Sequence, residues 1–413
     1  MKGMVKQMSK LKKQISKIIS YVYPRYVFHL EILAIVLVFI FALLIRLNFV
    51  FNMNHPELVT DAYNYDVMTK QFLDKGFLGY LSDEPNAVIT PGFPLFLSII
   101  YSIFGYENGS PLTQVRVIQS ILGSLTCILM YLIGKKIKNR KVGLITAISY
   151  AIYPAFAWSN SLILTETLYN FLFFLYFYVQ LIVLDKKTPV LSVICGILFA
   201  AAVLVRPLVF PLLVVPFIYD YIIHKDKRII KSFLFTAAGT LLLMIPWWIR
   251  NIVTLNKFIL LATQTGNPLI AGAFPYYSAD ISKYNVENQF LSGIKYIMEG
   301  FITQPLLYLK WFTIGKFNYI FGTAWFHPPE DFTFLRSLWL FHYVIISLGW
   351  LGVVFSIIKN RHVLISIFII LLTGLQLLFV PEWRYAYSII PFLMLLMASL
   401  IDYILWSSKP SDT

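Results

Sequence analysis

The sequence predicts an all-α protein that crosses a membrane many times. Of its 413 residues, 58% are hydrophobic and only 13% are charged, more apolar surface than a soluble domain can bury. Leu-, Ile- and Phe-rich runs of roughly 16–22 residues recur along the chain, and about 20 apolar residues span the hydrocarbon core as a helix. The alternation of apolar and polar residues that marks membrane β-strands is absent.

These apolar runs predict about ten membrane spans. The expected spans are 30–51, 115–134, 142–156, 163–184, 190–205, 207–223, 229–246, 337–358, 363–380 and 386–406. The first follows a basic stretch, but it is too long for a cleaved signal peptide and lacks a small-residue cleavage site. We therefore expect a retained signal anchor.

The distribution of basic residues predicts the orientation. The formal charge of +14 comes mostly from short clusters between apolar runs, which indicates anionic membrane lipid rather than nucleic acid as the partner. The positive-inside rule puts both termini in the cytoplasm. We expect the protein to lie in the plasma membrane. The expected layout is a basic cytoplasmic segment (1–29), one membrane domain (30–406) and a cytoplasmic tail (407–413).

Two segments on the outer side, 52–114 and 247–336, are too long to be simple turns. In the first, TPGFPLFLSIIYSIFG (90–105) is apolar but short, and two prolines punctuate its start, so it suits an interfacial helix better than a span. In the second, residues 308–326 mix aromatic side chains with Lys310 and Lys316, which is again interfacial in character. Long loops with helices of their own often carry function.

An acidic residue follows the first span almost at once. In VTDAYNYDVMTKQFLDKGFLGY, a helix would place Asp61 and Tyr65 on one face at i and i+4, near the outer membrane surface. The alternative is that Asp61 only caps this helix through its carboxylate.

Glu166 is the second candidate acid. About 20 residues separate it from the cytoplasmic Asp185, which puts it at the outer boundary of the hydrocarbon core. An ionisable group there is costly unless it faces protein or water, so we expect Glu166 to face a cavity. The alternative is an interfacial carboxylate that snorkels outward.

Several arginines belong to the same membrane face. Arg206 lies in a tight outer hairpin, Arg250 ends the seventh span, and Glu382 and Arg384 occupy the outer turn before the last span. Each alone could be an interfacial anchor. Together they predict an outer cavity that holds carboxylates and guanidinium groups, which suits proton abstraction beside a phosphate-bearing ligand.

Common soluble-enzyme motifs are missing: no Walker A loop, dinucleotide fingerprint, HExxH pair or Gly-x-Ser-x-Gly elbow occurs. The six histidines are scattered without ligand spacing, so no metal site is predicted and a role for a divalent metal stays open. HPPED (327–331) contains His and two carboxylates, but Pro-Pro favours a loop turn.

In the order of its motifs the chain resembles the GT-C fold of glycosyltransferases that use lipid-phosphate sugars. The families are the dolichyl-phosphate-mannose protein mannosyltransferases (glycosyltransferase family 39) and the lipid A aminoarabinose transferases. The resemblance covers about 55–400 and is strongest over 59–185. The stretches that carry it are Asp61 with Tyr65, TPGFPLFLSIIYSIFG, RVIQSILGSLTCILMYLIGKKI with KVGLITAISYAIYP, the Thr165-Glu166 pair, and RP, PWWIRN and EWRYAYSIIPFL.

The resemblance implies a sugar transfer on the extracytoplasmic face. Asp61 would be the catalytic base or orient the acceptor hydroxyl, with Glu166 in the same cavity. The donor would be a polyprenyl-phosphate sugar, and the acceptor would be a glycan, lipid or protein. The sugar would be transferred with inversion of its anomeric configuration. Arg206, Arg250 or Arg384 would offset the charge of the leaving phosphate, and Tyr65 and Glu382 would line the cavity.

The chain departs from these families in two ways. Thr90 stands where the aminoarabinose transferases usually have a lysine, and the chain ends seven residues after Trp406, which predicts a smaller, bacterial-type relative of the protein mannosyltransferases. The alternatives to an enzyme are a membrane transporter or lipid-linked sugar flippase, and a non-catalytic accessory subunit. Transporters, however, tend to place their charges at mid-membrane and to contain repeats.

Overall fold

The computed structural model describes residues 28–55, 57–264, 266–278, 289–326 and 339–407, and over these ranges every regular element is a helix. The all-α prediction is confirmed. The longer helices are Phe28–Asn52, α2 (Thr60–Lys75), α3 (Gly92–Phe104), α4 (Leu112–Ile137), α5 (Arg140–Ile152), α7 (Glu166–Lys186), α8 (Pro189–Val205), α9 (Val215–His224), α10 (Arg228–Leu255), α12 (Gln289–Thr303), α16 (Trp339–Ile358), α17 (Val363–Leu378) and α18 (Ile390–Asp402). Shorter pieces are α6 (Pro154–Trp158), η1 (Ser159–Ser161), η2 (Pro207–Val214), α11 (Gly266–Ala273), η3 (Pro275–Tyr277), α13 (Pro305–Lys310), η5 (Trp311–Gly315), α14 (Lys316–Phe321), η7 (Trp383–Ser388) and η8 (Tyr403–Ser407).

Six of these helices are long and apolar enough to cross a membrane, or up to seven if a bent pair counts as one span. The six are Phe28–Asn52, Leu112–Ile137, Glu166–Lys186, Pro207–His224, Arg228–Leu255 and Trp339–Ile358. The bent pair is Arg140–Ile152 with Pro154–Ser161, which meet at 62°. The other expected spans form apolar helices of 10–17 residues. A membrane protein with several spans is confirmed, whereas the count of ten is not.

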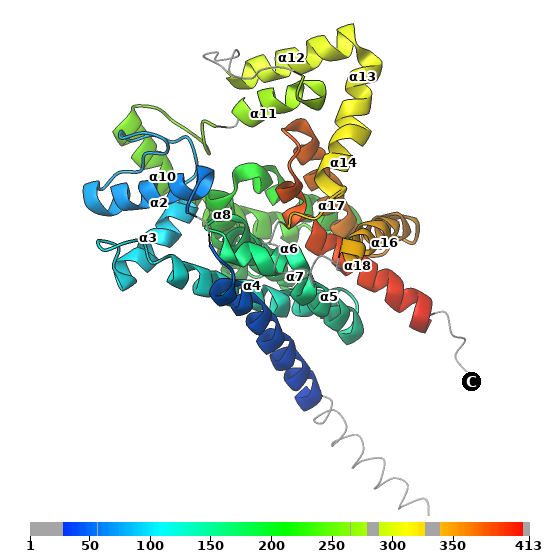
Figure 1. The fold of residues 1–413 in the computed structure, drawn as a ribbon. Helices are drawn as coiled ribbons and strands as arrows, with labels where there is room; N and C mark the ends of the chain where they lie inside the picture. The colour runs from blue at the N-terminus through cyan, green and yellow to red at the C-terminus, as the bar shows by residue number, and fades with distance from the viewer. Residues whose placement is uncertain (1–27, 56, 265, 279–288, 327–338, 408–413) are drawn as a thin grey trace, which may run out of the picture.

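The helices form a bundle from which the N-terminal helix and parts of the two expected outer segments project (Figure 1). The N-terminal helix extends away from one end of the bundle. At the other end, α2 and α3 lie to one side and α11 to α14 to the other, and both belong to the expected outer segments. The interfacial helix expected at 90–105 is α3, an apolar helix of 13 residues. The segments HPPED (327–331), 1–27 and 408–413 lie outside the described residues.

Close helix packing in the bundle depends on small residues. A Cβ atom added to Gly196 of α8 would lie 1.9 Å from the Thr236 carbonyl oxygen of α10, and one on Gly239 would lie 2.1 Å from the Val193 oxygen. Thr240 also donates a hydrogen bond of 3.2 Å to the Gly196 carbonyl oxygen. Because lipid tails give no hydrophobic drive for association, such backbone contact is what holds membrane helices together.

Aromatic rings fill the core between α7, α17 and α18. Phe173 and Phe177 of α7 and Phe368 of α17 are fully buried. All three rings contact Phe392 of α18, with centroids 4.9–5.9 Å apart. Edge-to-face and tilted pairs of this kind add to the stability gained from burial.

The close contact of α8 with α10 predicts the effect of a single methyl group. Gly196→Ala should lower the free energy of unfolding by about 1–3 kcal/mol, because the added carbon would overlap the Thr236 carbonyl. Gly374→Ala is the matched control, since a Cβ atom there meets nothing within 4 Å and alanine favours the helix. Thermal unfolding in detergent measures both. Equal midpoints for the two variants would contradict the contact.

Candidate functional site

Asp61 lies in the first turn of α2 but does not cap it. The N-cap residue is Val59, and no side chain caps this helix end. Instead, the Asp61 Oδ1 atom accepts a hydrogen bond of 2.9 Å from the Tyr80 hydroxyl, and its Oδ2 atom lies 3.0 Å from Nη1 of Arg384. The Asp61 side chain is 34% exposed. The carboxylate therefore joins two distant parts of the chain and stays within reach of solvent.

Glu166 is buried at the first residue of α7. It is 1% exposed, so it does not snorkel outward. Its Oε1 atom lies 3.2 Å from Nη2 of Arg206, and the Thr165 hydroxyl donates to Oε2 over 3.3 Å. The N-terminal end of a helix also stabilises a negative charge. Glu166 thus has an ionic partner and a favourable helix end.

A break in the helices that precede α7 places Glu166 at this buried position. After the bend at Tyr153, the chain leaves helical geometry before α7 begins. Arg116 of α4 donates from Nε to the Ser161 carbonyl oxygen over 2.9 Å. Gln119 donates to the carbonyl oxygens of Asn160 and Leu162, at 3.1 and 2.6 Å. These contacts satisfy the irregular backbone, which a membrane protein tolerates only where protein surrounds it.

Arg384 is positioned by η7, which packs against this same break. The Tyr387 hydroxyl shares a hydrogen bond of 2.6 Å with the Ser159 hydroxyl, and Asn170 of α7 donates to the Tyr387 carbonyl oxygen over 3.2 Å. The ring of Tyr385 lies 5.8 Å from the guanidinium carbon of Arg384 and 5.9 Å from that of Arg206. One aromatic ring therefore contacts both arginines and makes the two ion pairs neighbours.

The charges of the two carboxylates act on the same groups. Burial lowers the pKa of Arg384, but the electrostatic interactions with Glu166, Tyr385 and Asp61 and the hydrogen bond to Asp61 outweigh it and raise that pKa above its usual value. Burial raises the pKa of Tyr65, and Asp61, Tyr80 and Glu166 raise it further. Arg384 therefore stays charged and the Tyr65 hydroxyl stays protonated.

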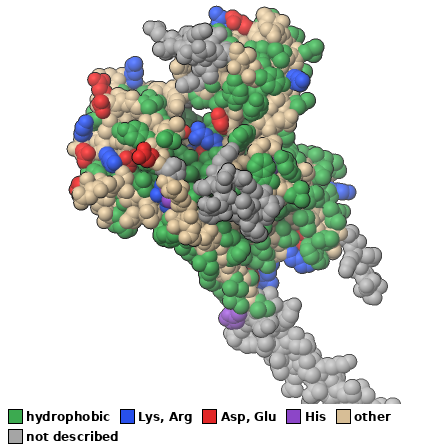
Figure 2. All heavy atoms as spheres, viewed as in Figure 1, with side chains coloured by type: hydrophobic (Ala, Val, Ile, Leu, Met, Phe, Trp, Pro, Cys, Tyr) green, Lys and Arg blue, Asp and Glu red, His purple; other side chains and the backbone are tan. Residues whose placement is uncertain are grey.

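The structure thus brings together Asp61, Glu166, Arg206, Arg384 and Tyr65 in what we call the two-pair cluster. Tyr65 packs edge-on against Phe93 of α3, with ring centroids 5.0 Å apart. The space-filling view shows a hollow between the part that carries α2 and α3 and the part that carries α11 to α14, with basic and acidic side chains in it (Figure 2).

Two expected site residues lie elsewhere. Arg250 donates from Nη1 to the Asn86 carbonyl oxygen over 2.8 Å and from Nη2 to the Leu78 carbonyl oxygen over 3.0 Å. It therefore holds the turn that carries Tyr80. Glu382 is exposed, and its charge acts on Tyr277 and Tyr385.

Tyr80 and Tyr385 belong to the site, although no sequence pattern predicts them there. Tyr80 lies in GFLGY and Tyr385 directly follows Arg384, so each belonged to a stretch already singled out, but no spacing rule points to them. A second acid of α2, Asp66, is structural: it accepts hydrogen bonds from the Tyr101 and Ser110 hydroxyls, at 2.6 and 2.5 Å.

Lys316 is fully buried rather than interfacial. Its Nζ atom donates to the carbonyl oxygens of Leu377 and Phe379, at 2.8 and 3.0 Å, and so caps the end of α17. Burial lowers the pKa of Lys316 to about 6. Tyr277 donates to the Pro381 carbonyl oxygen over 2.8 Å. The second outer segment therefore fixes the turn that leads to Arg384.

Metal-ligating side chains do not gather in the part of the chain that the structure describes. No group of three or more His, Cys, Asp or Glu side chains there could hold a metal ion.

A comparison with protein families matches residues 83–249 to the family described as dolichyl-phosphate-mannose-protein mannosyltransferase. The match covers fewer than half of the 413 residues. It includes Glu166 and Arg206, whereas Asp61 and Arg384 lie outside it. No curated protein matches the sequence.

Solved structures resemble the chain over most of its length. The oligosaccharyltransferase of Archaeoglobus fulgidus in its apo form has a TM-score of 0.56 at 16% identity, over 90% of this chain and 50% of its own. The same organism's oligosaccharyltransferase AglB, in complex with an inhibitory peptide and a dolichol-phosphate, has a TM-score of 0.54 at 15% identity. This match covers 90% of the present chain and 50% of AglB. ArnT from Cupriavidus metallidurans in the apo state has a TM-score of 0.54 at 13% identity. This match covers 89% of the present chain and 59% of ArnT.

The chain therefore spans about half the length of these structures. At such low identity the likeness shows the fold alone, and it is the GT-C fold. The expected resemblance to GT-C glycosyltransferases is confirmed.

The contacts of Arg250 predict a structural role for it. Arg250→Gln should lower the free energy of unfolding by about 1.5–3 kcal/mol, because buried carbonyl oxygens of the first outer segment lose charged donors. Arg228→Gln on the same helix is the control, since that side chain is 82% exposed. Thermal unfolding distinguishes the two. An unchanged midpoint for Arg250→Gln would make a ligand-binding role the better explanation.

Proposed function

We propose that the protein is a glycosyltransferase that moves a sugar from a polyprenyl-phosphate donor to an acceptor hydroxyl, with inversion. The observation that carries this proposal is the two-pair cluster. It combines a carboxylate that solvent can reach with two guanidinium groups, at the end of the bundle where two outer segments meet. The family match and the fold support the same reaction class.

The proposed chemistry is a single displacement at the anomeric carbon. Asp61 removes the proton of the acceptor hydroxyl as its oxygen bonds to that carbon. The bond from the anomeric carbon to the phosphate oxygen breaks, and polyprenyl phosphate leaves with the electron pair. One displacement inverts the configuration.

Arg384 and Arg206 are the groups that we assign to the leaving phosphate. Their side chains are 30% and 23% exposed, whereas Arg250 is engaged with loop carbonyls. A guanidinium fork can bind phosphate with two hydrogen bonds. Because Arg384 pairs with Asp61 here, a phosphate that attracted Arg384 would also release the Asp61 carboxylate to act as a base.

Glu166 has a positioning role in this proposal. It is buried, and Arg206 is its ionic partner, so it cannot reach an acceptor in the bulk solvent. Its charge keeps the Arg206 guanidinium in place and helps to keep Arg384 charged. Tyr65 and Tyr80 serve as protonated donors beside Asp61.

We further propose that the reaction takes place on the outer face of a bacterial plasma membrane, with both termini in the cytoplasm. The support is the position of basic residues at the far ends of the same helices: Lys135 and Lys136 end α4, whereas Lys186 ends α7, which begins at Glu166. Positive charge favours the cytoplasmic side.

The first activity prediction concerns Asp61. In membranes incubated with a panel of radiolabelled polyprenyl-phosphate sugars, Asp61→Asn should lower transfer by about 10²–10⁴-fold, the usual contribution of a general base. Glu107→Gln, an exposed acid of the same outer segment, should keep full activity. Full transfer by Asp61→Asn at equal expression would remove this residue from the mechanism. Sugar translocation without transfer in the wild type would instead identify a flippase.

The second activity prediction separates the arginines. Arg384→Gln should lower the rate constant of transfer by about 10²-fold or more, because the departing phosphate loses a charged donor. Arg384→Lys should recover part of that loss, since it keeps the charge but not the fork. Arg250→Gln, assayed below its unfolding temperature, should keep the rate constant. The reverse pattern would assign the phosphate to Arg250.

A further inference from the structure

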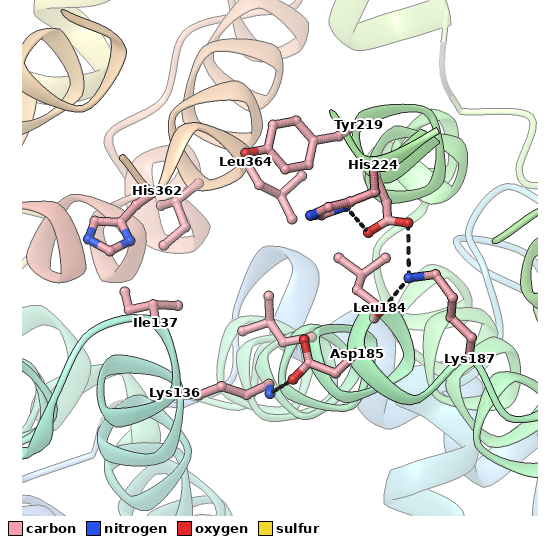
Figure 3. A pocket seen from close by; sticks show the side chains of 12 residues that line it. Lys136, Ile137, Leu184, Asp185, Lys187, Tyr219, His224, His362 and Leu364 are labelled. Carbon is pink, nitrogen blue, oxygen red and sulfur yellow. Dashed lines mark hydrogen bonds and ion pairs between the residues drawn. The ribbon is translucent and has the colours of Figure 1, made fainter. Parts of the chain in front are cut away.

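A cavity of about 420 Å³ lies at the end of α7 that is opposite to Glu166, and Figure 3 shows the side chains that line it. It is lined by the ends of α4, α7 and α9 and by the start of α17. Asp185, near the end of α7, lines the cavity, whereas Glu166 is the first residue of α7. At a helical rise of 1.5 Å per residue, these two positions are about 28 Å apart. Its size is in the usual range for small-molecule sites.

Two lysines and two aspartates provide most of the charge in this cavity. Lys136 forms an ion pair with Asp185. Lys187 lies 3.2 Å from Oδ2 of Asp220, and His224 lies 2.8 Å from Oδ1 of the same carboxylate through its Nδ1 atom. In Figure 3 these side chains approach one another from α4, α7 and α9.

Asp220 is buried, and one of its oxygens has an ion-pair partner but lacks a hydrogen bond. Its side chain is 3% exposed, and its Oδ2 atom accepts no hydrogen bond from the residues that the structure describes. Lys187 Nζ lies 3.2 Å from this oxygen as an ion-pair partner, and it also donates to the Leu184 carbonyl oxygen over 2.7 Å. A buried carboxylate oxygen without a hydrogen bond is costly. An ammonium group of a ligand would supply that hydrogen bond.

The remaining lining is apolar and the net charge is balanced. Leu181, Leu184, Leu364 and Ile365 face the cavity. Burial, with the charges of Lys138 and Arg361, lowers the pKa of His362 to about 4, so this histidine is neutral at pH 7. An amphipathic ligand whose polar part carries one negative and one positive charge matches both properties.

We propose that this cavity binds the headgroup of a phospholipid that combines a phosphate diester with a primary ammonium group. Lys136 and Lys187 donate to the phosphate oxygens, and the ammonium group donates to Asp220. The apolar side chains contact the glycerol and the first acyl carbons. The place of the cavity at a membrane face favours a lipid over a soluble phosphate.

The headgroup chemistry makes this proposal selective. A quaternary choline has no N–H to give to Asp220, and a glycerol headgroup leaves the lipid with an unbalanced negative charge. A lipid held here would join the ends of four helices and so stabilise the bundle at the face opposite to Asp61. This inference does not depend on the proposed enzymatic activity.

The test uses the full chain, purified in detergent, with three lipids of identical acyl chains: phosphatidylethanolamine, phosphatidylcholine and phosphatidylglycerol. Native mass spectrometry and the lipid-dependent rise in unfolding temperature are measured. Phosphatidylethanolamine should bind about tenfold more tightly than phosphatidylcholine, the ratio that one charge-assisted hydrogen bond supplies. Equal binding of the three, or preference for phosphatidylglycerol, would overturn the proposal. Glycerophosphoethanolamine should bind far more weakly, and equal binding of it would assign a soluble ligand.

Variants localise the effect. Asp220→Asn should abolish the preference for phosphatidylethanolamine over phosphatidylcholine, and Lys136→Gln should weaken the binding of both. Lys186→Gln, an exposed lysine next to Asp185, should change neither. If Asp220→Asn does not fold, Lys136→Gln decides the location, because Lys136 lies at the surface end of α4. Unchanged binding by Lys136→Gln would place the lipid elsewhere and overturn the assignment.

Discussion

The ion pair between Asp61 and Arg384 is the contact on which the two-pair cluster depends. These residues are 323 positions apart in the sequence, so the pair connects the first outer segment to the turn before the last helix. Beside it, Glu166 is buried, and its charge would be costly without Arg206. Since Tyr385 contacts both guanidinium groups, a displacement of one pair changes the surroundings of the other.

The position of Arg384 is fixed from outside the bundle. Lys316 caps the end of α17, and Tyr277 binds the carbonyl oxygen of Pro381, three residues before Arg384. A Cβ atom on Gly272 would lie 2.3 Å from the Phe379 backbone, so the second outer segment packs directly on this turn. Backbone carbonyl groups at a helix end need donors in an apolar environment. The contacts that satisfy them here also position Arg384.

Local features of the sequence predicted much of this arrangement. Hydropathy predicted the helices because a bilayer requires about 20 apolar residues per span, and the cost of a charge in such a run pointed to Glu166. Sequence could not decide whether Asp61 caps its helix, because a cap and a long-range partner leave the same local pattern. Arg250 and Arg384 both lie within two residues of a tryptophan at an outer boundary. Only tertiary contacts separate the arginine that holds a loop from the one that pairs with the acid.

The count of ten spans is not confirmed, because three of the expected spans form apolar helices of only 10–17 residues. Hydropathy does not distinguish a continuous helix from α5 and α6, which are apolar but meet at 62°. That bend makes the cluster possible, because it starts α7 at Glu166 instead of carrying a helix past it. α7 then presents a carboxylate at its positive N-terminal end and lysines at its negative C-terminal end, an order that the helix dipole favours. The membrane keeps charge out of the 20 or so residues between, so polar chemistry in this fold is confined to the two ends of the bundle.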